Sequence, residues 1–270
     1  MGGTLAMGGE HAGSDKPTGP LKVAFSSPEG AVGLVSEVNV VFDRPVHALG
    51  VVNPAEAAPF RITPALPGSF RWVGSRAAVF TPSQRLPFAT GFVVEVPAGF
   101  PALDGTRLPA AHRFEFETRR PSLQSSTPSE GEQGLGLDTA LRVELNQVVT
   151  PAALRASAKL EMDSGRGFSA VGFDVATDPK QPRALILRPK RPLSPHSTVV
   201  LTLAASLRSV EGPLPSDSER TVTFRRFDPL ALQEVSCAHR ENEPCEADSS
   251  VSLICNNSVK PQSLLGKVHI

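Results

Sequence analysis

Three short segments of the chain share one pattern of apolar and polar positions. They begin at Val38, Leu141 and Val251, and in each the first, third and fifth residues are apolar while Asp or Asn stands sixth. Alternation with a period of two is typical of a β-strand with one buried face. An Asx side chain at the strand end is suited to bond its own backbone in a turn. The pattern predicts three equivalent strands, whose first residues are spaced by 103 and then 110 positions.

Further shared motifs follow the first two of these strands in the same order. The first shared motif is an apolar residue followed by a proline two positions later and then by a leucine. An apolar strand pattern and a closing strand with alternating apolar residues come after it in both units. The matched pairs are 80–86 with 187–193, 92–96 with 199–203, and 114–116 with 222–224. Short strands separated by turn signals, in units of about 100 residues, are typical of antiparallel β-sandwiches with about seven strands.

The repeats predict an all-β chain of tandem Ig/fibronectin-III-like antiparallel β-sandwiches. The predicted divisions are a flexible leader at 1–20, a first sandwich at 21–120, a second at 121–229 and the start of a truncated third at 230–270. The few strands that residues 230–270 can form are not enough to bury a sandwich core. We therefore expect the third copy to be the beginning of a module and the chain to be the front part of a longer protein.

Helix is expected in only two places. Thr150 and Pro151 have the residue types of a helix cap and first turn, which predicts a short helix through Ala156. Pro54–Ala58 predicts a similar helical turn at the corresponding place in the first unit. The 26 prolines and 22 glycines agree with a turn-rich chain that contains little helix.

The charge balance and targeting signals limit the possible partners. Lys+Arg 27 equals Asp+Glu 27, so the chain lacks the overall positive charge that is typical of a nucleic-acid binder. No apolar stretch reaches the roughly 18 residues that span a bilayer, so we expect no direct membrane insertion by this segment. Residues 1–20 lack the basic and apolar regions of a secretory signal, and this absence does not by itself assign a compartment.

All three cysteines lie near the end of the chain. A Cys237–Cys245 disulfide, closing a short loop, is the possible pairing in an oxidising compartment. A zinc site would recruit His239, but its Cys-x-His spacing suits tetrahedral sites poorly. Cys255 is the fifth residue of the third strand pattern, an inward position, which predicts a buried thiol.

The remaining candidates for chemistry are weak. The six histidines form no H-x-x-x-H pair, and there is no G-x-S-x-G. His47 and His196 stand near turn prolines and are expected to be exposed. Gly165–Ala170 has the glycine spacing of a dinucleotide fingerprint, but a strand pattern follows it, which favours a hairpin turn. The basic run Arg188–Pro192 is expected to be a solvated loop. We therefore expect no enzyme activity, no cofactor, no metal and no nucleic-acid partner.

Several motifs of the first unit together resemble a known family. They are Phe60-Arg-Ile-Thr-Pro64, Gly68-Ser-Phe70-Arg-Trp72, Val79-Phe-Thr-Pro82, Leu86 and the closing strand Phe114-Glu-Phe-Glu-Thr118. This run resembles the macroglobulin-type, Ig-like domains on the N-terminal side of bacterial α2-macroglobulins. The resemblance covers roughly residues 20 to 270 and is best in the first unit. Similar Ig-like modules also occur in other bacterial surface proteins.

The resemblance implies a role in a protease trap. Family members enclose a protease after it cuts a bait segment, and many carry a thioester made by a Cys-x-Glu-Gln sequence. No cysteine of this chain begins that sequence, and no bait segment is recognisable. The implied function is therefore the N-terminal scaffold of an endopeptidase inhibitor, in the periplasm or elsewhere in the cell envelope. Its implied partners are neighbouring macroglobulin-type domains and, through the full-length protein, target proteases.

A second function fits the same repeats. Ig-like modules also serve as structural or glycan-binding parts of bacterial surface adhesins. Phe70 and Trp72 lie on one face of a predicted strand, where core packing is the favoured interpretation and an exposed glycan-binding pair is the alternative. The coding sequence beyond Ile270 would separate the two functions.

Overall fold

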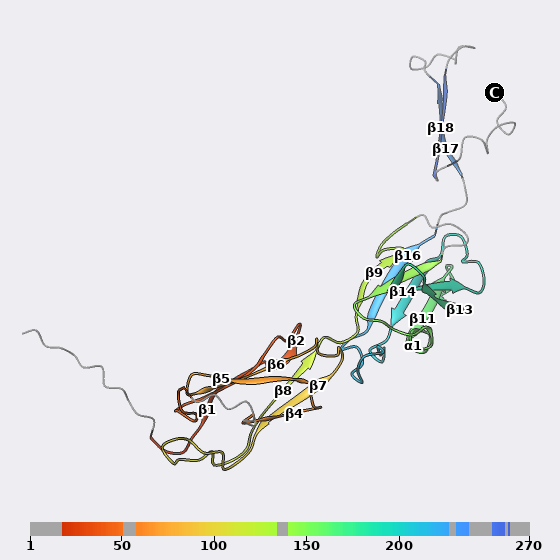
Figure 1. The fold of residues 1–270 in the computed structure, drawn as a ribbon. Helices are drawn as coiled ribbons and strands as arrows, with labels where there is room; N and C mark the ends of the chain where they lie inside the picture. The colour runs from red at the N-terminus through yellow and green to blue at the C-terminus, as the bar shows by residue number, and fades with distance from the viewer. Residues whose placement is uncertain are drawn as a thin grey trace, which may run out of the picture. The chain divides into compact units, whose positions relative to one another are not determined.

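The computed structural model describes residues 18–50, 58–133, 140–226, 231–237, 250–256 and 259. These residues fall into two compact units, the first made of 18–87 and 91–119, the second of 88–90 and the described residues from Arg120 onward. The described residues contain eighteen strands and one helix (Figure 1). The predicted all-β class is therefore confirmed.

The first unit is a sandwich of two four-stranded sheets. One has the order β1-β3-β6-β5 and the other β2-β8-β7-β4, and every pairing is antiparallel except β2 with β8. In immunoglobulin terms these are the A-B-E-D and A′-G-F-C sheets. The strands are β1 (Val23–Ser27), β2 (Gly30–Val32), β3 (Val38–Phe42), β4 (Arg61–Thr63), β5 (Gly68–Val73), β6 (Ala77–Pro82), β7 (Gly91–Val96) and β8 (His112–Thr118).

The core of this unit lies between its two sheets. Alternate residues of β3 and β7 are at most 1% exposed, as the period-two pattern predicts. They are Val38, Val40 and Phe42 from β3, and Phe92, Val94 and Val96 from β7. The Phe92 ring stacks on Phe116 of β8 with centroids 5.1 Å apart.

The second unit repeats this topology. Its sheets have the orders β9-β10-β14-β13 and β12-β11-β15-β16. The strands are β9 (Leu123–Thr127), β10 (Leu141–Leu145), β11 (Ala158–Asp163), β12 (Phe168–Ala170), β13 (Phe173–Asp178), β14 (Gln181–Pro189), β15 (Thr198–Leu203) and β16 (Arg220–Arg225). The first sheet is again A-B-E-D, and in the second β11, β15 and β16 correspond to C, F and G.

Two local differences separate the units. The second has an extra edge strand, β12, which pairs with β11. In place of β2, residues 131–132 lie beside β16, because Gly131 N–H donates to the Thr223 carbonyl at 2.8 Å and Arg225 N–H donates to that of Glu132 at 2.9 Å. The predicted short helix is present as α1 (Pro151–Ser157), and the Thr150 hydroxyl caps it.

A two-stranded hairpin follows the second sandwich in the sequence. It consists of β17 (Leu232–Cys237) and β18 (Val251–Cys255), which pair antiparallel. The three predicted equivalent strands are thus β3, β10 and β18, and each begins at the predicted residue. Each pairs antiparallel with the strand that opens its sandwich or hairpin, β1, β9 or β17.

The conserved geometry of these three pairs extends to hydrogen bonds at the strand ends. In every copy the Asp or Asn after the second strand bonds twice to one residue at the start of the first strand. Its side-chain Oδ1 accepts that residue's N–H, and its own N–H donates to that residue's carbonyl. The pairs are Asp43 with Lys22 (3.2 and 3.0 Å), Asn146 with Ser122 (2.9 and 3.0 Å) and Asn256 with Ala231 (2.8 and 3.1 Å). We call this pair of hydrogen bonds the Asx clamp.

The Asx clamp corrects one interpretation from the sequence. The Asx side chain was expected to bond the backbone of its own turn, but it reaches a residue 21, 24 or 25 positions earlier. The reason is that the strand paired with it begins alongside and presents an N–H at the strand end, where the ladder no longer pairs it. The strand pattern contains the Asx residue, but it does not contain the partner, which lies more than 20 positions earlier.

A shared bulge also marks the three strand pairs. In each, the register shifts at the end near the Asx clamp, so that one residue of the first strand is skipped. The skipped residues are Ala24, Gln124 and Gln233. A bulge bends the strand locally. The same bulge at the same place supports the structural equivalence of the three pairs.

Three other expectations have different outcomes. Gly165–Ala170 forms the turn and second strand of the β11–β12 hairpin, as predicted, with positive φ at Gly165 and Gly167. Cys255 is only half-buried, so the buried thiol was wrong, because no described strand of a second sheet covers this hairpin as it covers β3 and β10. Pro54–Ala58 lies outside the described residues except for Ala58.

Candidate functional site

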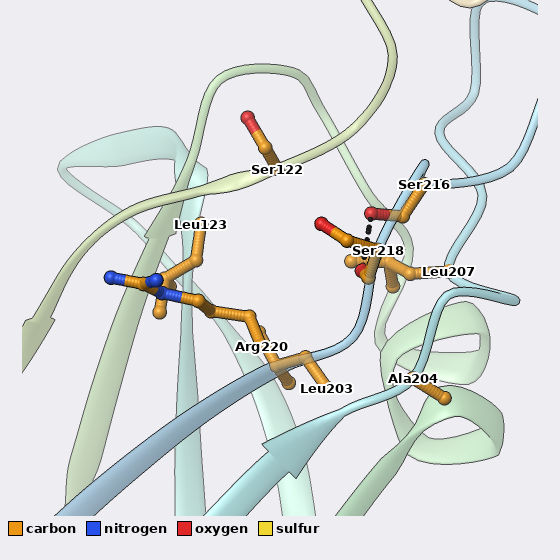
Figure 2. A pocket seen from close by; sticks show the side chains of 8 residues that line it. All are labelled: Ser122, Leu123, Leu203, Ala204, Leu207, Ser216, Ser218 and Arg220. Carbon is orange, nitrogen blue, oxygen red and sulfur yellow. Dashed lines mark hydrogen bonds between the residues drawn. The ribbon is translucent and has the colours of Figure 1, made fainter.

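One hollow in the second unit gathers polar side chains over an apolar floor (Figure 2). Its volume is about 210 Å³, and it lies where β9 and β16 begin and β15 ends. The floor includes Leu203 and Leu207, which are 3% and 2% exposed. The lining residues are Ser122, Leu123, Leu203, Ala204, Leu207, Ser216, Ser218 and Arg220.

Backbone hydrogen bonds fix the rim of this hollow. Ser122 is held by the Asx clamp to Asn146. Ser216 N–H donates to the Leu207 carbonyl at 2.8 Å, and the Ser216 hydroxyl donates to the Ser218 carbonyl at 3.0 Å. The rim is therefore preorganised by main-chain contacts.

Arg220 is the one titratable residue among the described residues that line the hollow. Figure 2 shows its side chain extended toward the side where Leu123 lies. A guanidinium stays protonated at any physiological pH, so it cannot transfer a proton as a general acid or base. It can donate hydrogen bonds to a small polar or anionic group.

A shallower hollow lies on the first unit. It has a volume of about 400 Å³ and opens over β2, β7 and β8. Small residues leave the space: Gly91 on β7 and Ala31 on β2 both stand opposite Glu117 on β8. Glu117 and Glu115 are the two carboxylates among the lining residues, and Glu115 accepts a 2.8 Å hydrogen bond from Arg113. The result is an open surface with an acidic margin.

The first unit also contains a buried arginine. Arg44 is 3% exposed, and its guanidinium donates to the carboxylates of Asp43 and Asp104 and to the carbonyls of Gly19 and Pro20. Thr106 completes the set, because its hydroxyl accepts from Arg44 Nη1 at 3.1 Å. The cluster ties the start of the first unit and the loop after β7 to the end of β3.

The ionisation of the two aspartates follows from these contacts. The hydrogen bond from Arg44 lowers the pKa of Asp43, and the N–H of Lys22 lowers it further. The pKa of Asp104 is lowered mainly by its bonds from the Thr106 hydroxyl and N–H, and then by Arg44. Both groups are thus held in their charged forms as parts of a stabilising network, since hydrogen bonding to a carboxylate favours ionisation.

The sequence-derived candidates do not gather in either hollow. His47 was expected to be exposed and is buried, because its ring stacks on Trp72 with centroids 4.9 Å apart. His196 is exposed, as predicted. Cys245 and His239 lie outside the described residues, so the Cys237–Cys245 disulfide stays a prediction. In the part of the chain that the structure describes, no three His, Cys, Asp or Glu residues group as metal ligands.

The residues that form the second-unit hollow were not predicted. They come from separated segments, 122–123, 203–207 and 216–220, and serines and leucines at those positions form no recognisable motif. Arg44 was missed for a related reason, because its acidic partner Asp104 is 60 residues away. Only the tertiary fold brings such groups together.

The strand orders define a class of protein, namely tandem Ig-like β-sandwiches. A comparison with protein families agrees for one unit: residues 117–226 match the family described as bacterial Ig-like domain. No curated protein matches the chain. Among the described residues, no helix has both the length and the apolar character to cross a membrane.

Several solved structures resemble parts of the chain. One is PcoC, a methionine-rich copper resistance protein from Escherichia coli, with 22% identity over 39% of this chain and 96% of that one, at a TM-score of 0.28. An L,D-transpeptidase from Mycobacterium tuberculosis H37Rv has 16% identity over 58% and 80%, at 0.25. The titin domains z1z2, in complex with telethonin, have 12% identity over 79% and 98%, at 0.29. These TM-scores are too low to support a fold class. The class of tandem Ig-like β-sandwiches is supported by the strand order and by the family match.

Proposed function

We propose that the chain supplies non-enzymatic scaffold modules of a bacterial cell-envelope protein. The observation that carries this proposal is the repetition of one Ig-like unit with its own closed core, strand order and Asx clamp. Independent cores linked in series are suited to separate other parts of a protein along the chain. The match of residues 117–226 to a bacterial Ig-like family supports the same role.

In its finer form, the proposal is the N-terminal scaffold of an α2-macroglobulin-like endopeptidase inhibitor. The support is the sequence run from Phe60 to Leu86. Phe60 and Leu86 are buried in the first core, and Phe70 packs edge-on against both Phe60 and Trp72. The residues that carry the resemblance are therefore ones that pack in or against the core of the module. Target proteases and neighbouring macroglobulin-type domains are the proposed partners, in the periplasm or elsewhere in the envelope.

A protease assay tests this division of labour. The purified chain, mixed at equimolar ratio with a serine protease, should leave the hydrolysis of both casein and a small chromogenic peptide unchanged. Inhibition of either substrate by the chain alone would contradict a scaffold without trapping groups.

A second assay tests the finer form. Antibodies raised against residues 140–226 would capture the native protein from the bacterial envelope fraction. We expect the captured protein to block casein hydrolysis while small-peptide hydrolysis continues, because a trap excludes large substrates and admits small ones. Captured protein that leaves casein hydrolysis untouched would overturn the inhibitor proposal and leave the scaffold proposal standing.

The adhesin alternative is kept because the family match to bacterial Ig-like domains fits it equally. Its glycan-binding version is weakened by the positions of Phe70 and Trp72, which pack against the first core. A glycan array with the purified chain tests it, and binding that is lost in Trp72→Ala and retained in Val73→Ala would favour this alternative.

A further inference from the structure

The loop that covers the hollow of the second unit has an equivalent loop in the first unit. One follows β15 and the other follows β7, and in each the N–H of the fourth loop residue donates to the carbonyl of the first. Leu207 and Phe100 hold this fourth position, with distances of 3.1 and 3.4 Å. Their carbonyls then accept an N–H from later in the loop, from Ser216 at 2.8 Å and from Leu108 at 2.9 Å. Leu207 is therefore equivalent to Phe100, and Ser216 to Leu108.

The side chains at these two positions explain why the second unit is hollow here. In the first unit, the Phe100 ring stacks on Phe42 with centroids 5.2 Å apart, and Leu108 is 5% exposed. The second unit has the smaller residues Leu207 and Ser216 at the same positions. The space that a ring and a leucine occupy in one unit is thus the space of the 210 Å³ hollow in the other (Figure 2).

A charged side chain stands beside this space at an inward-facing position of its strand. Val222 and Phe224 of β16 are 4% and 1% exposed, and Arg220 has the same parity because it lies two positions before Val222. It pairs with Leu203 of the apolar floor. Arg220 is exposed, so its guanidinium meets water while its methylene groups can cover the floor. Within the described part of the chain, no hydrogen bond or ion pair engages its side chain.

The equivalent position in the first unit has a polar partner inside its own module. His112 pairs with Val96 as Arg220 pairs with Leu203. The His112 Nε2 lies 3.3 Å from the Ser26 Oγ of β1. The second unit therefore differs in two ways at one place: its core end is hollow, and the polar group above it is a cation available to a ligand.

We propose that this hollow binds a short apolar carboxylate. Its hydrocarbon chain lies on the floor formed by Leu203 and Leu207, and its carboxylate pairs with Arg220. Ligand sites combine apolar walls with a few polar groups, and a guanidinium can donate to both oxygens of a carboxylate. The acidic residues beside Arg220 in the sequence, Asp217 and Glu219, are not among the described residues that line the hollow, so no carboxylate of the lining opposes an anion.

The size of the hollow limits the ligand. A volume of about 210 Å³ equals roughly seven waters at about 30 Å³ each, which suits a molecule as small as hexanoate. The proposal goes beyond the scaffold function, because it gives one module a ligand of its own. It does not depend on whether the full protein is an inhibitor or an adhesin.

Titration of the full chain with sodium hexanoate, at constant ionic strength, tests the site. We expect saturable NMR shifts of the amides of Leu123, Leu207 and Ser216, while the amides of β5 in the first unit are unchanged. Hexanol lacks the charge and acetate lacks the hydrocarbon chain. Each should therefore bind about tenfold or more weakly than hexanoate, because both halves of the site contribute.

Variants on β16 and in the loop form the matched set. Arg220→Gln should weaken hexanoate binding about tenfold or more, whereas Arg225→Gln, at the other end of β16, should leave it within about twofold. Leu207→Phe places in the loop the ring that the first unit carries as Phe100, and it should block binding although Arg220 is retained. Unchanged amide shifts of β10 verify that each variant is folded. If Leu207→Phe disturbs the fold, the two arginine variants still decide the test, because both arginines are exposed.

A peptide distinguishes two sources of the same chemistry. Acetyl-glycyl-leucine presents an apolar side chain and a free carboxylate, as the C-terminus of a polypeptide does. Binding at least as tight as that of hexanoate would assign the natural ligand to a polypeptide C-terminus, and weaker binding would assign it to a free small carboxylate. Both results support a site for apolar carboxylates.

Three results would overturn the proposal. The first is hexanol or acetate binding as tightly as hexanoate, because the site would then not recognise the combination of charge and chain. The second is an equal effect of Arg220→Gln and Arg225→Gln. The third is the absence of saturable shifts around the hollow at any hexanoate concentration that leaves the chain folded.

Discussion

At the scale of single residues, the Asx clamp is the most informative feature of the molecule. Asn146 is 6% exposed and uses both ends of its amide, accepting from Ser122 N–H and donating to the Arg120 carbonyl at 2.7 Å. When such a side chain is removed, its partners are left without a hydrogen bond, at a cost of about 1–3 kcal/mol for a buried group. The clamp therefore fixes where each unit begins as well as where its second strand ends.

Substitution of Asn146 tests this role. Asn146→Ala should lower the free energy of unfolding of the second unit by about 1–3 kcal/mol, because Ser122 N–H and the Arg120 carbonyl lose a buried partner. Urea unfolding followed by NMR signals of each unit is the measurement. The exposed control Ser125→Ala should change the value by less than about 0.5 kcal/mol. Equal effects of the two substitutions would show that the clamp contributes no stability.

The first unit differs because its clamp residue titrates. Arg44 lowers the pKa of Asp43 below the ordinary value of 3.8, so the carboxylate stabilises the folded unit above about pH 4. That contribution is lost as the pH falls further. Asp43→Asn keeps an oxygen acceptor for Lys22 N–H but removes the charge that faces Arg44.

The pH dependence of this variant is a second test. Asp43→Asn should lower the melting temperature of the first unit at pH 7, and the gap to the wild type should narrow as the pH falls from 5 to 3. Thermal unfolding followed by the fluorescence of Trp72, which lies in the first unit, measures this directly. A gap that stays constant or widens on acidification would exclude the charge as its origin.

At the scale of elements, the sequence predicts strands well where one face is buried. The strands that begin at Val38, Leu141 and Val251 were placed correctly because alternation is a local property. Thr150 likewise predicted the start of α1, because a cap acts within three residues. The burial of His47 and the half-exposure of Cys255 depend on what packs against them from elsewhere, and local patterns do not contain that information.

The helix cap supplies a prediction at this scale. Thr150 Oγ1 accepts the Ala153 N–H at 3.1 Å, and loss of such a cap costs about 0.5–2 kcal/mol. Thr150→Ala should lower the unfolding free energy of the second unit by that amount in urea titrations. Thr150→Ser retains the hydroxyl and should stay within a few tenths of a kcal/mol of the wild type. A serine variant as unstable as the alanine variant would contradict the capping role.

At the scale of the whole molecule, the same strand arrangement recurs along the chain. Two copies are complete sandwiches, and the β17–β18 hairpin has the strand pairing, bulge and Asx clamp of the other two openings. The sequence predicted this repetition from pattern alone. It did not predict the hollow around Arg220 or the Arg44 cluster, because neither has a sequence motif. The proposed scaffold function depends on the repetition and not on either site.

The most direct test of the repetition is the detection of the three Asx clamps in solution. Scalar couplings across hydrogen bonds, measured by NMR, report a donor nitrogen and the carbonyl carbon of its acceptor. We predict a coupling from Asp43 N to the Lys22 carbonyl, from Asn146 N to that of Ser122 and from Asn256 N to that of Ala231. Couplings at the first two sites with none at Asn256, in a chain whose β17 and β18 amides are assigned, would contradict the claim that the hairpin opens a third copy.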